Sequence, residues 1–557
     1  MSDFTSWWSE ETGAQELNGD IRSPASGPSR RALLKAGVAA AAVAPFLMRV
    51  DDAIAQGITP KRGGTLTSLL TPEPPVLMIG VNAQGPTLTV VSKIFQPLFT
   101  YSPTLDFVPV LAKSWTISDD KKVYTFRLQE NVKFHDGQPM TADDVIFSAM
   151  KFWMTLSLRA RIVFARIEKA EATDPYTVVI TLKESYAPFM YGFGGTGFTI
   201  VPKHLYDVAD LRNNPNNAKP VGTGPFKLVE WQRGSFIRLR RNEDYWKPNQ
   251  PYLDEIVYRI VPDSQSRAVA LQSGQVQLAG GNDIEPFDLP RFQAQSNLSV
   301  TLKGWEYYGP LAWIDINKRV KPLDDVRVRR AMSMALDRNF ILQKLWFNSG
   351  KVATGPMCET TKFYDATVKL PPFDIAAANK LLDEAGHKAD GSGIRFTIRH
   401  MPLPYGEVWT RLSEYFRASM QKIGINVTMD TTDAGGHTAR MAKWDYETSI
   451  NYIYQVGDAN IGLEQYFTSE NIRNVAFNNV GGYSNPRVDE LLAKSRYATD
   501  PAERQKLLSE FQRIAVDDMP YLFLIQMSFP TYTTKRLNNV ITTAMGISGD
   551  FDDVFLA

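Results

Sequence analysis

Hydrophobic and polar positions alternate through much of the first half of the chain, as they do in half-buried strands. The strands predicted from this pattern are 64–70, 123–128, 131–134, 178–182, 227–241 and 256–261, and the second and third of these form a predicted hairpin. A helix is predicted from Thr141, which can cap it together with Asp144 three residues later. This half is therefore predicted to be mixed α and β, and rich in strands.

From about residue 320 the apolar positions recur at helical spacing instead. Helices are predicted to begin after Asp325, Asp374, Asn485 and Asp500, because each of these side chains can cap the first turn that follows. Asn485 and Asp500 also precede a proline, which suits the first helical position. We interpret the apolar stripes of these helices as core, in preference to a surface for a partner.

Composition and charge narrow the classes of function. The chain has 557 residues, 44% hydrophobic and 22% charged, as in an ordinary globular protein. Its 61 basic and 60 acidic residues almost cancel, so no binding of nucleic acid is expected. Cys358 is the only cysteine, which excludes an intramolecular disulfide and a four-thiolate zinc site. We expect no cofactor.

The first 55 residues have the outline of a cleaved export signal. Arg30 and Arg31 precede an apolar run over 36–47, and the small residues Ala53 and Ala55 mark a cleavage site. The arginine pair and the weakly apolar run resemble a twin-arginine signal. A helix of about 12 residues spans only ~18 Å, too short for a membrane anchor. No cysteine follows the run, so we expect a periplasmic protein without a lipid anchor.

Several segments carry a resemblance to a known family, and they follow one another in the family's order. They include Leu-Ala-Lys-Ser-Trp at 111–115, Val-Lys-Phe-His-Asp-Gly at 132–137, Thr-Ala-Asp-Asp-Val at 141–145, Gly-Thr-Gly-Pro-Phe at 222–226 and Asp-Val-Arg-Val-Arg-Arg-Ala at 325–331. Together they resemble the family 5 extracellular solute-binding proteins, of the dipeptide- and oligopeptide-binding type, which serve ABC importers.

The resemblance implies an α/β fold of two lobes, joined by a hinge that the chain crosses twice, with an extra subdomain inserted in the first lobe. The expected divisions are 1–55 signal peptide, 56–97 plus 218–309 plus 523–557 lobe I, 98–217 inserted subdomain and 310–522 lobe II. It further implies a monomer that captures a peptide or peptide-like solute between the lobes by hinge closure. The solute then passes to the permease subunits in the membrane.

Other functions find weaker support in the residues. The glycines of Gly192-Phe-Gly-Gly-Thr-Gly197 fit a dinucleotide-binding pattern, but the strand-like residues 198–202 that follow cannot open the helix such a site needs. We therefore expect no enzyme. A metal chelate or haem bound through His400 or His437, or an opine-like compound, remains an alternative ligand on the same fold.

The resemblance also implies residues of the ligand site. Asp458 is the candidate to hold a ligand amino group, and an aspartate that caps its own loop is the alternative. Leu403 stands where the dipeptide branch has an arginine for the ligand carboxylate, which favours a longer peptide or another amino compound. An aromatic lining is expected from Tyr405, Trp409, Trp444, Tyr452 and Tyr454.

Overall fold

The computed structural model describes residues 59–195 and 197–557. The predicted signal residues Arg30, Arg31, Ala53 and Ala55 lie outside this part of the chain. None of the described helices is both long enough and apolar enough to cross a membrane.

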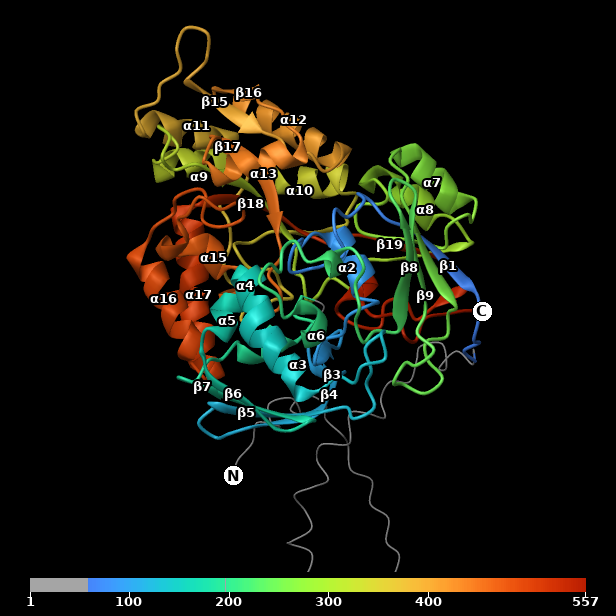
Figure 1. The fold of residues 1–557 in the computed structure, drawn as a ribbon. Helices are drawn as coiled ribbons and strands as arrows, with labels where there is room; N and C mark the ends of the chain where they lie inside the picture. The colour runs from blue at the N-terminus through green and yellow to red at the C-terminus, as the bar shows by residue number, and fades with distance from the viewer. Residues whose placement is uncertain (1–58, 196) are drawn as a thin grey trace, which may run out of the picture. The chain divides into compact units, whose positions relative to one another are not determined.

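Two large sheets organise the described chain (Figure 1). In spatial order, the seven-stranded sheet contains β12 (Leu298–Thr301), β19 (Thr531–Thr534), β11 (Leu278–Ala279), β1 (Thr65–Leu69), β10 (Glu255–Arg259), β9 (Phe236–Arg241) and β8 (Phe226–Gln232). The six-stranded sheet contains β14 (Gly350–Val352), β18 (Tyr521–Met527), β13 (Leu311–Ile316), β17 (Thr448–Ile453), β15 (Phe396–Met401) and β16 (Ile425–Met429). We call the parts built on them lobe I and lobe II.

The chain passes between the two sheets twice. It leaves lobe I after β12 and enters lobe II at β13, and it returns from β18 to β19. The predicted return at residue 523 falls inside β18, which pairs with β13 through residues 521–523, 525 and 526. We call residues 528–530, which lead from β18 to β19, the return segment.

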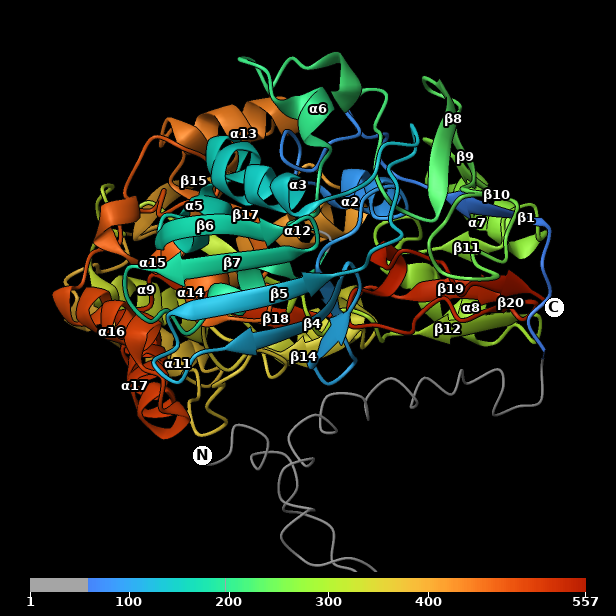
Figure 2. The ribbon, with the colours of Figure 1, turned by 60° about the horizontal axis from the view of Figure 1, so that its bottom comes forward.

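A four-stranded antiparallel sheet lies within residues 98–217, in the order β4 (Ala112–Ile117), β5 (Val123–Leu128), β7 (Thr177–Leu182) and β6 (Ile167–Asp174) (Figure 2). The predicted hairpin of 123–128 with 131–134 is wrong, because β5 pairs with β4 and β7. The sequence pattern did not predict strand β4, because most of its residues are exposed and its apolar and polar positions do not alternate regularly.

The helices begin where the capping side chains predict. Thr141 and Asp144 form a capping box at α3 (Ala142–Phe147), which continues as a π-helical segment over 148–153. The other predicted helices are α9 (Val326–Met334), α11 (Ile375–Glu384), α16 (Pro486–Tyr497) and α17 (Pro501–Asp518), each with its predicted Asp or Asn at the N-cap. The remaining helices include α2 (Gly85–Val91), α4 (Met154–Leu156), α5 (Leu158–Phe164), α6 (Lys203–Tyr206), α7 (Ser264–Gln272), α8 (Leu289–Gln293), α10 (Arg338–Phe340), α12 (Glu407–Gln421), α13 (Ala434–Ala442), α14 (Ala459–Gly462) and α15 (Glu464–Phe467).

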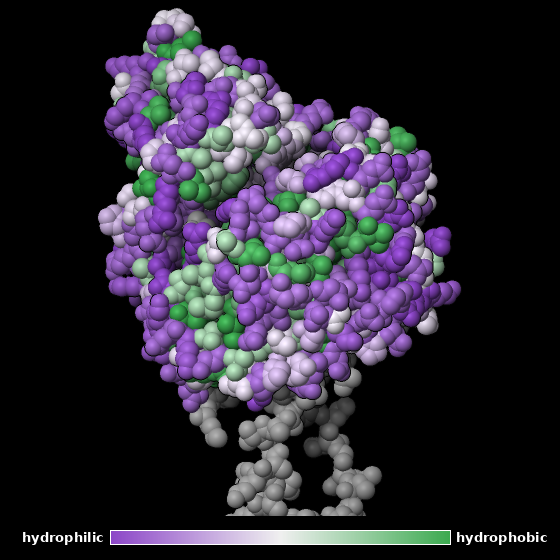
Figure 3. All heavy atoms as spheres, in the orientation of Figure 1, coloured by the Kyte–Doolittle hydropathy of each residue, from purple (hydrophilic) through white to green (hydrophobic). Residues whose placement is uncertain are grey.

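Each lobe has its own main hydrophobic core. One core joins the seven-stranded sheet to the four-stranded sheet through residues such as Leu66, Phe95 and Phe126, so residues 98–217 share their core with lobe I. The other packs helices of lobe II on the six-stranded sheet, around Trp313 and Phe416. On the face seen in Figure 3, hydrophilic residues predominate and the apolar ones form small separate patches.

Candidate functional site

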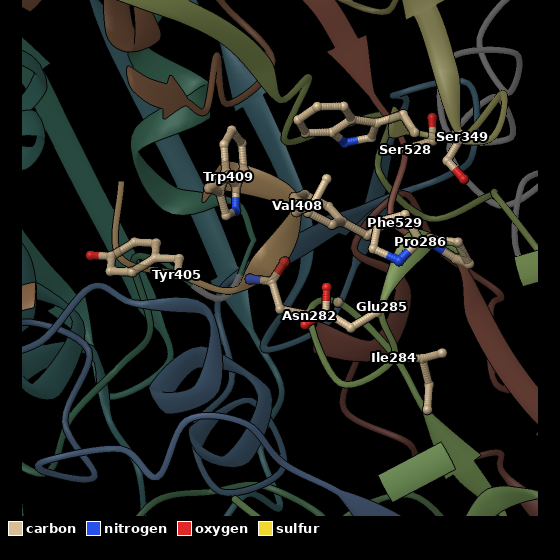
Figure 4. Close-up of a pocket in the computed structure, with 13 residues that line it drawn as sticks. Asn282, Ile284, Glu285, Pro286, Ser349, Tyr405, Val408, Trp409, Ser528 and Phe529 are labelled. Carbon is tan, nitrogen blue, oxygen red and sulfur yellow. The ribbon is translucent and has the colours of Figure 1, made fainter. Parts of the chain in front are cut away.

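A pocket opens where residues of both lobes meet the return segment (Figure 4). Lobe I supplies the loop after β11, lobe II supplies residues before and within α12, and 528–530 belong to the return segment. The space amounts to about 430 Å³, including its opening to solvent. The thirteen residues that line it are Gly281, Asn282, Ile284, Glu285, Pro286, Trp346, Ser349, Tyr405, Val408, Trp409, Ser528, Phe529 and Pro530.

The turn before α12 presents two predicted residues to this pocket. Gly406 precedes the helix with φ of 121°, a conformation that favours glycine. Tyr405 and Trp409 then lie on either side of the helix start, and both line the pocket. The Tyr405 hydroxyl lies near the Gln84 side chain of lobe I, and burial raises the pKa of this tyrosine, so its hydroxyl stays protonated at neutral pH.

A row of aromatic rings leads from the pocket into the interface. Trp409 stacks on Tyr452 with ring centroids 5.3 Å apart, and Tyr452 meets Tyr454 edge to face at 5.7 Å. The row continues from Tyr454 through Tyr308, Tyr307 and Tyr101 to Tyr191, each ring within 6 Å of the next. Four of the five predicted aromatic residues are thus brought together.

Asp458 lies near the far end of this row, fully buried. It is the N-cap of α14, where its Oδ1 accepts a hydrogen bond from the Asn460 backbone N–H at 3.0 Å. The same oxygen accepts from Arg504 Nη2 at 2.8 Å. Asp458 thus caps the first turn of α14 and also forms an ion pair with Arg504.

The other oxygen of this carboxylate, Asp458 Oδ2, is buried and has no hydrogen-bond partner among the described residues. The hydroxyls of Tyr101, Tyr186 and Tyr191 are also buried without a partner in this part of the chain. Burial raises the pKa of each of these tyrosines, and the negative charge of Asp458 raises it further. Buried polar groups are normally paired, and leaving one unpaired costs about 1–3 kcal/mol. This concentration of unpaired oxygens therefore identifies a place that suits a polar ligand group.

Polar contacts join the lobes around the site. Arg159 Nη2 donates to the Tyr454 carbonyl oxygen at 3.4 Å, and the Asn282 side chain lies near the Tyr452 hydroxyl. Burial raises the pKa of Tyr452 to about 12, which keeps that hydroxyl neutral. A solute that reached both the pocket and Asp458 would touch both lobes.

Trp444 is not brought to this site. It packs in a small cluster of lobe II with Met401 and Tyr446, and the Arg319 guanidinium lies 3.7 Å from its ring centroid. Leu403 is likewise buried, in the main core of lobe II. Neither side chain lines the pocket.

His400 and His437 lie close to each other inside lobe II but have their own partners. His400 is hydrogen-bonded to Thr448 and Ser413, and His437 to Ser449. Burial lowers the pKa of His400 to about 3 and that of His437 to about 4, so both are neutral at pH 7. No cluster of metal-ligating side chains occurs within residues 59–195 and 197–557.

The glycine-rich segment from Gly192 serves close packing. A Cβ at Gly192 would lie 2.5 Å from Val163 Cγ1, and one at Gly194 would lie 2.3 Å from the Tyr101 hydroxyl oxygen. These glycines let the segment pack directly against neighbouring side chains. No helix begins at residues 198–202, and the next helix is the four-residue α6, which begins at Lys203.

Sequence reasoning missed several residues of the site. Tyr101, Tyr191 and Tyr307 lie in segments for which the sequence predicted no element. Arg504 lies on the helix predicted after Asp500, where no role was assigned to it. The loop residues Asn282 and Glu285 carried no motif. Their shared position at the interface of the lobes depends on the tertiary fold and leaves no local signal in the sequence.

Comparison with known proteins identifies the family of this chain. Residues 106–474, more than half of the chain, match the middle part of the bacterial extracellular solute-binding proteins, family 5. The chain belongs to this family. Two relatives of this family 5 protein are a glutathione-binding protein, GsiB, of Pectobacterium atrosepticum and a dipeptide-binding protein of Pseudomonas aeruginosa. The first is 29% identical over 91% of this chain and 95% of its own length, and the second is 29% identical over 74% and 80%.

A solved structure of a periplasmic binding protein has the same fold as this chain. It is the periplasmic binding protein DppA of Helicobacter pylori, associated with an ABC transporter and in complex with the peptide STSA. The TM-score is 0.78 at 25% identity, covering 89% of this chain and 98% of that one. The expected two-lobed α/β fold is therefore confirmed.

Proposed function

We propose that this family 5 protein captures a peptide or peptide-like small solute between its lobes and delivers it to the permease of an ABC importer. Membership of the family supports the capture of a solute, and the names of the relatives support a peptide-like ligand. In this proposal the protein holds the solute without transforming it.

One observation carries the peptide-like ligand: Asp458 Oδ2 is buried without a partner beside the unpaired hydroxyls of Tyr101, Tyr186 and Tyr191. A ligand ammonium group has three N–H donors, which could pair with the carboxylate oxygen and neighbouring hydroxyl oxygens. Arg504 pairs with Oδ1, while Oδ2 has no hydrogen-bond partner among the described residues and would pair with the ligand. The pocket at Tyr405 and Trp409 would receive another part of the same solute.

Lobe closure is the proposed mechanism of capture. A solute that contacts lobe I, lobe II and the return segment binds the closed arrangement more tightly than an open one, so binding shifts the equilibrium toward closure. The two crossings, between β12 and β13 and between β18 and β19, are the proposed hinge. We place the end of lobe II at Met527 and keep residues 98–217 as the proposed insertion.

The proposed location is the periplasm. We propose export through the twin-arginine signal over residues 1–55, release without a lipid anchor, and action as a monomer. Opine-like compounds stay within the proposed ligand class, since they also combine amino and polar groups.

The experiment is to identify what the protein retains. Protein purified from its own periplasm is denatured, and the released small molecules are identified by mass spectrometry. Calorimetric titration of the refolded protein with each candidate then measures affinity and stoichiometry. The proposal predicts one amino compound bound per chain and recovered unchanged after incubation. Conversion of the compound would contradict it, and so would retention of a ligand without an amino group.

A further inference from the structure

The pocket at the start of α12 carries a net negative charge. Among its thirteen lining residues, all in the described part of the chain, Glu285 alone is charged. It reaches the pocket from the lobe I loop beside Asn282, opposite the α12 residue Val408 (Figure 4). Its carboxylate also lies against the turn before α12, since a Cβ at Gly406 would be 3.3 Å from Glu285 Oε1.

The arginines nearest to Glu285 are held by other groups. Arg411 donates to the Glu407 carboxylate at 2.6 Å and lies over the Phe287 ring. Arg267 is buried and donates to the carbonyl oxygens of residues 261, 262 and 283. Neither of these two arginines lines the pocket, so neither presents its guanidinium there to a ligand carboxylate.

The rest of the lining favours the same kind of ligand group. Trp346, Tyr405 and Trp409 surround the space, and aromatic faces attract cations. Trp409 Nε1 is a buried donor without a partner among the described residues, and it suits a neutral carbonyl oxygen. Burial raises the pKa of Glu285, while Arg267, the backbone N–H of Glu407 and Arg411 oppose that rise.

We infer that this pocket takes a positively charged end of the ligand, an amine or guanidine group joined to an amide carbonyl, and that Glu285 determines this specificity. A ligand carboxylate in the same place would face Glu285 at short range in a partly buried site, where like charges repel strongly. The inference rests on the proposed function, because it assumes a peptide-like solute.

The test compares three probes of one size class by calorimetry with the refolded protein. These are Ala-Ala-agmatine, with a guanidine end, Ala-Ala-Ala amide, with a neutral end, and Ala-Ala-Ala, with a carboxylate end. The inference predicts that the guanidine probe binds at least about tenfold more tightly than the carboxylate probe. The neutral probe should lie between them.

Glu285→Gln keeps the shape of the side chain and removes its charge. This variant should lose at least about tenfold in affinity for the guanidine probe and stay within about threefold for the neutral one. Glu407→Gln is the matched control, because it removes an exposed carboxylate next to the pocket that is paired with Arg411. It should leave all three affinities within about threefold, and thermal melts should show that both variants fold.

Each other outcome is decisive. Tighter binding of the carboxylate probe, or an unchanged affinity of Glu285→Gln for the guanidine probe, would overturn the role of Glu285 while leaving the proposed function intact. If no probe binds at concentrations on the order of 1 mM, the peptide-like ligand class is rejected, and the inference falls with it.

Discussion

Replacing Asp458 with asparagine tests whether the buried ion pair with Arg504 stabilises the fold. The Asp458 side chain is 0% exposed and that of Arg504 is 6% exposed. Asparagine caps a helix about as well as aspartate does, so the cap of α14 by itself predicts almost no change. Any large effect must therefore come from the lost charge.

The expected loss in the free energy of unfolding depends on the hydrogen bonds that Arg504 retains in the variant. Breaking a buried ion pair by removing one partner costs about 3–5 kcal/mol, because it leaves an uncompensated charge. Arg504 retains hydrogen bonds to the Ser495 carbonyl oxygen at 2.9 Å and to Asn460 Oδ1 at 2.7 Å, and the asparagine oxygen can still accept from it. We therefore expect Asp458→Asn to lower the free energy of unfolding by about 2–3 kcal/mol.

Urea denaturation of ligand-free protein, obtained by unfolding and refolding, measures this difference. Asp374→Asn is the matched control, since Asp374 caps α11 from an exposed position and its side chain accepts a hydrogen bond only from Ala377 N–H among the described residues. It should stay within about 0.5 kcal/mol of the wild type. An equally small change for Asp458→Asn, with an unaltered slope against urea, would refute the stabilising role of the pair.

Three further outcomes are expected. Replacing Arg30 and Arg31 with lysines should leave unprocessed precursor in the cytoplasm, and normal periplasmic maturation, seen by fractionation and immunoblotting, would disprove the twin-arginine assignment. Small-angle scattering should give a smaller radius of gyration with the retained ligand than without it, and an unchanged radius at saturation would argue against closure. The pKa of His400 is about 3 in the folded protein and 6.5 for an ordinary histidine. Between these two pH values the unfolded state binds a proton that the folded state does not, so the free energy of unfolding falls as the pH drops below 6.5. His400→Gln should therefore lose about 2 kcal/mol less than the wild type between pH 7 and pH 5, measured by urea denaturation; equal losses would contradict a buried neutral histidine.

The charged groups near Asp458 bear on how the site binds its ligand. Burial lowers the pKa of Lys362, while the negative charge of Asp458 opposes that shift. Arg504 and Lys362 thus both interact electrostatically with the Asp458 carboxylate in a buried region. An added ligand ammonium must compete with these cations, which makes its position sensitive to the hydrogen-bonding geometry at Oδ2.

The sequence by itself determined the local elements. The capping residues Thr141, Asp325, Asp374, Asn485 and Asp500 stand at the starts of helices, because a cap and an apolar stripe act within one or two turns of the chain. The ordered motifs also indicated the family and its two-lobed fold. Tyr405, Trp409, Tyr452, Tyr454 and Asp458 were expected near one another, and the structure gathers them along the interface between the lobes.

Only the tertiary structure decided which residues face each other. The pairing of β5 with β4, the position of Trp444 away from the pocket and the contact of Asp458 with Arg504 all depend on packing between distant segments. Glu285 reaches the pocket only because the loop after β11 meets the start of α12. Local periodicity shows which side of an element is buried. The partner that buries this side is decided by contacts between residues far apart in the chain, and no short window of sequence contains both partners.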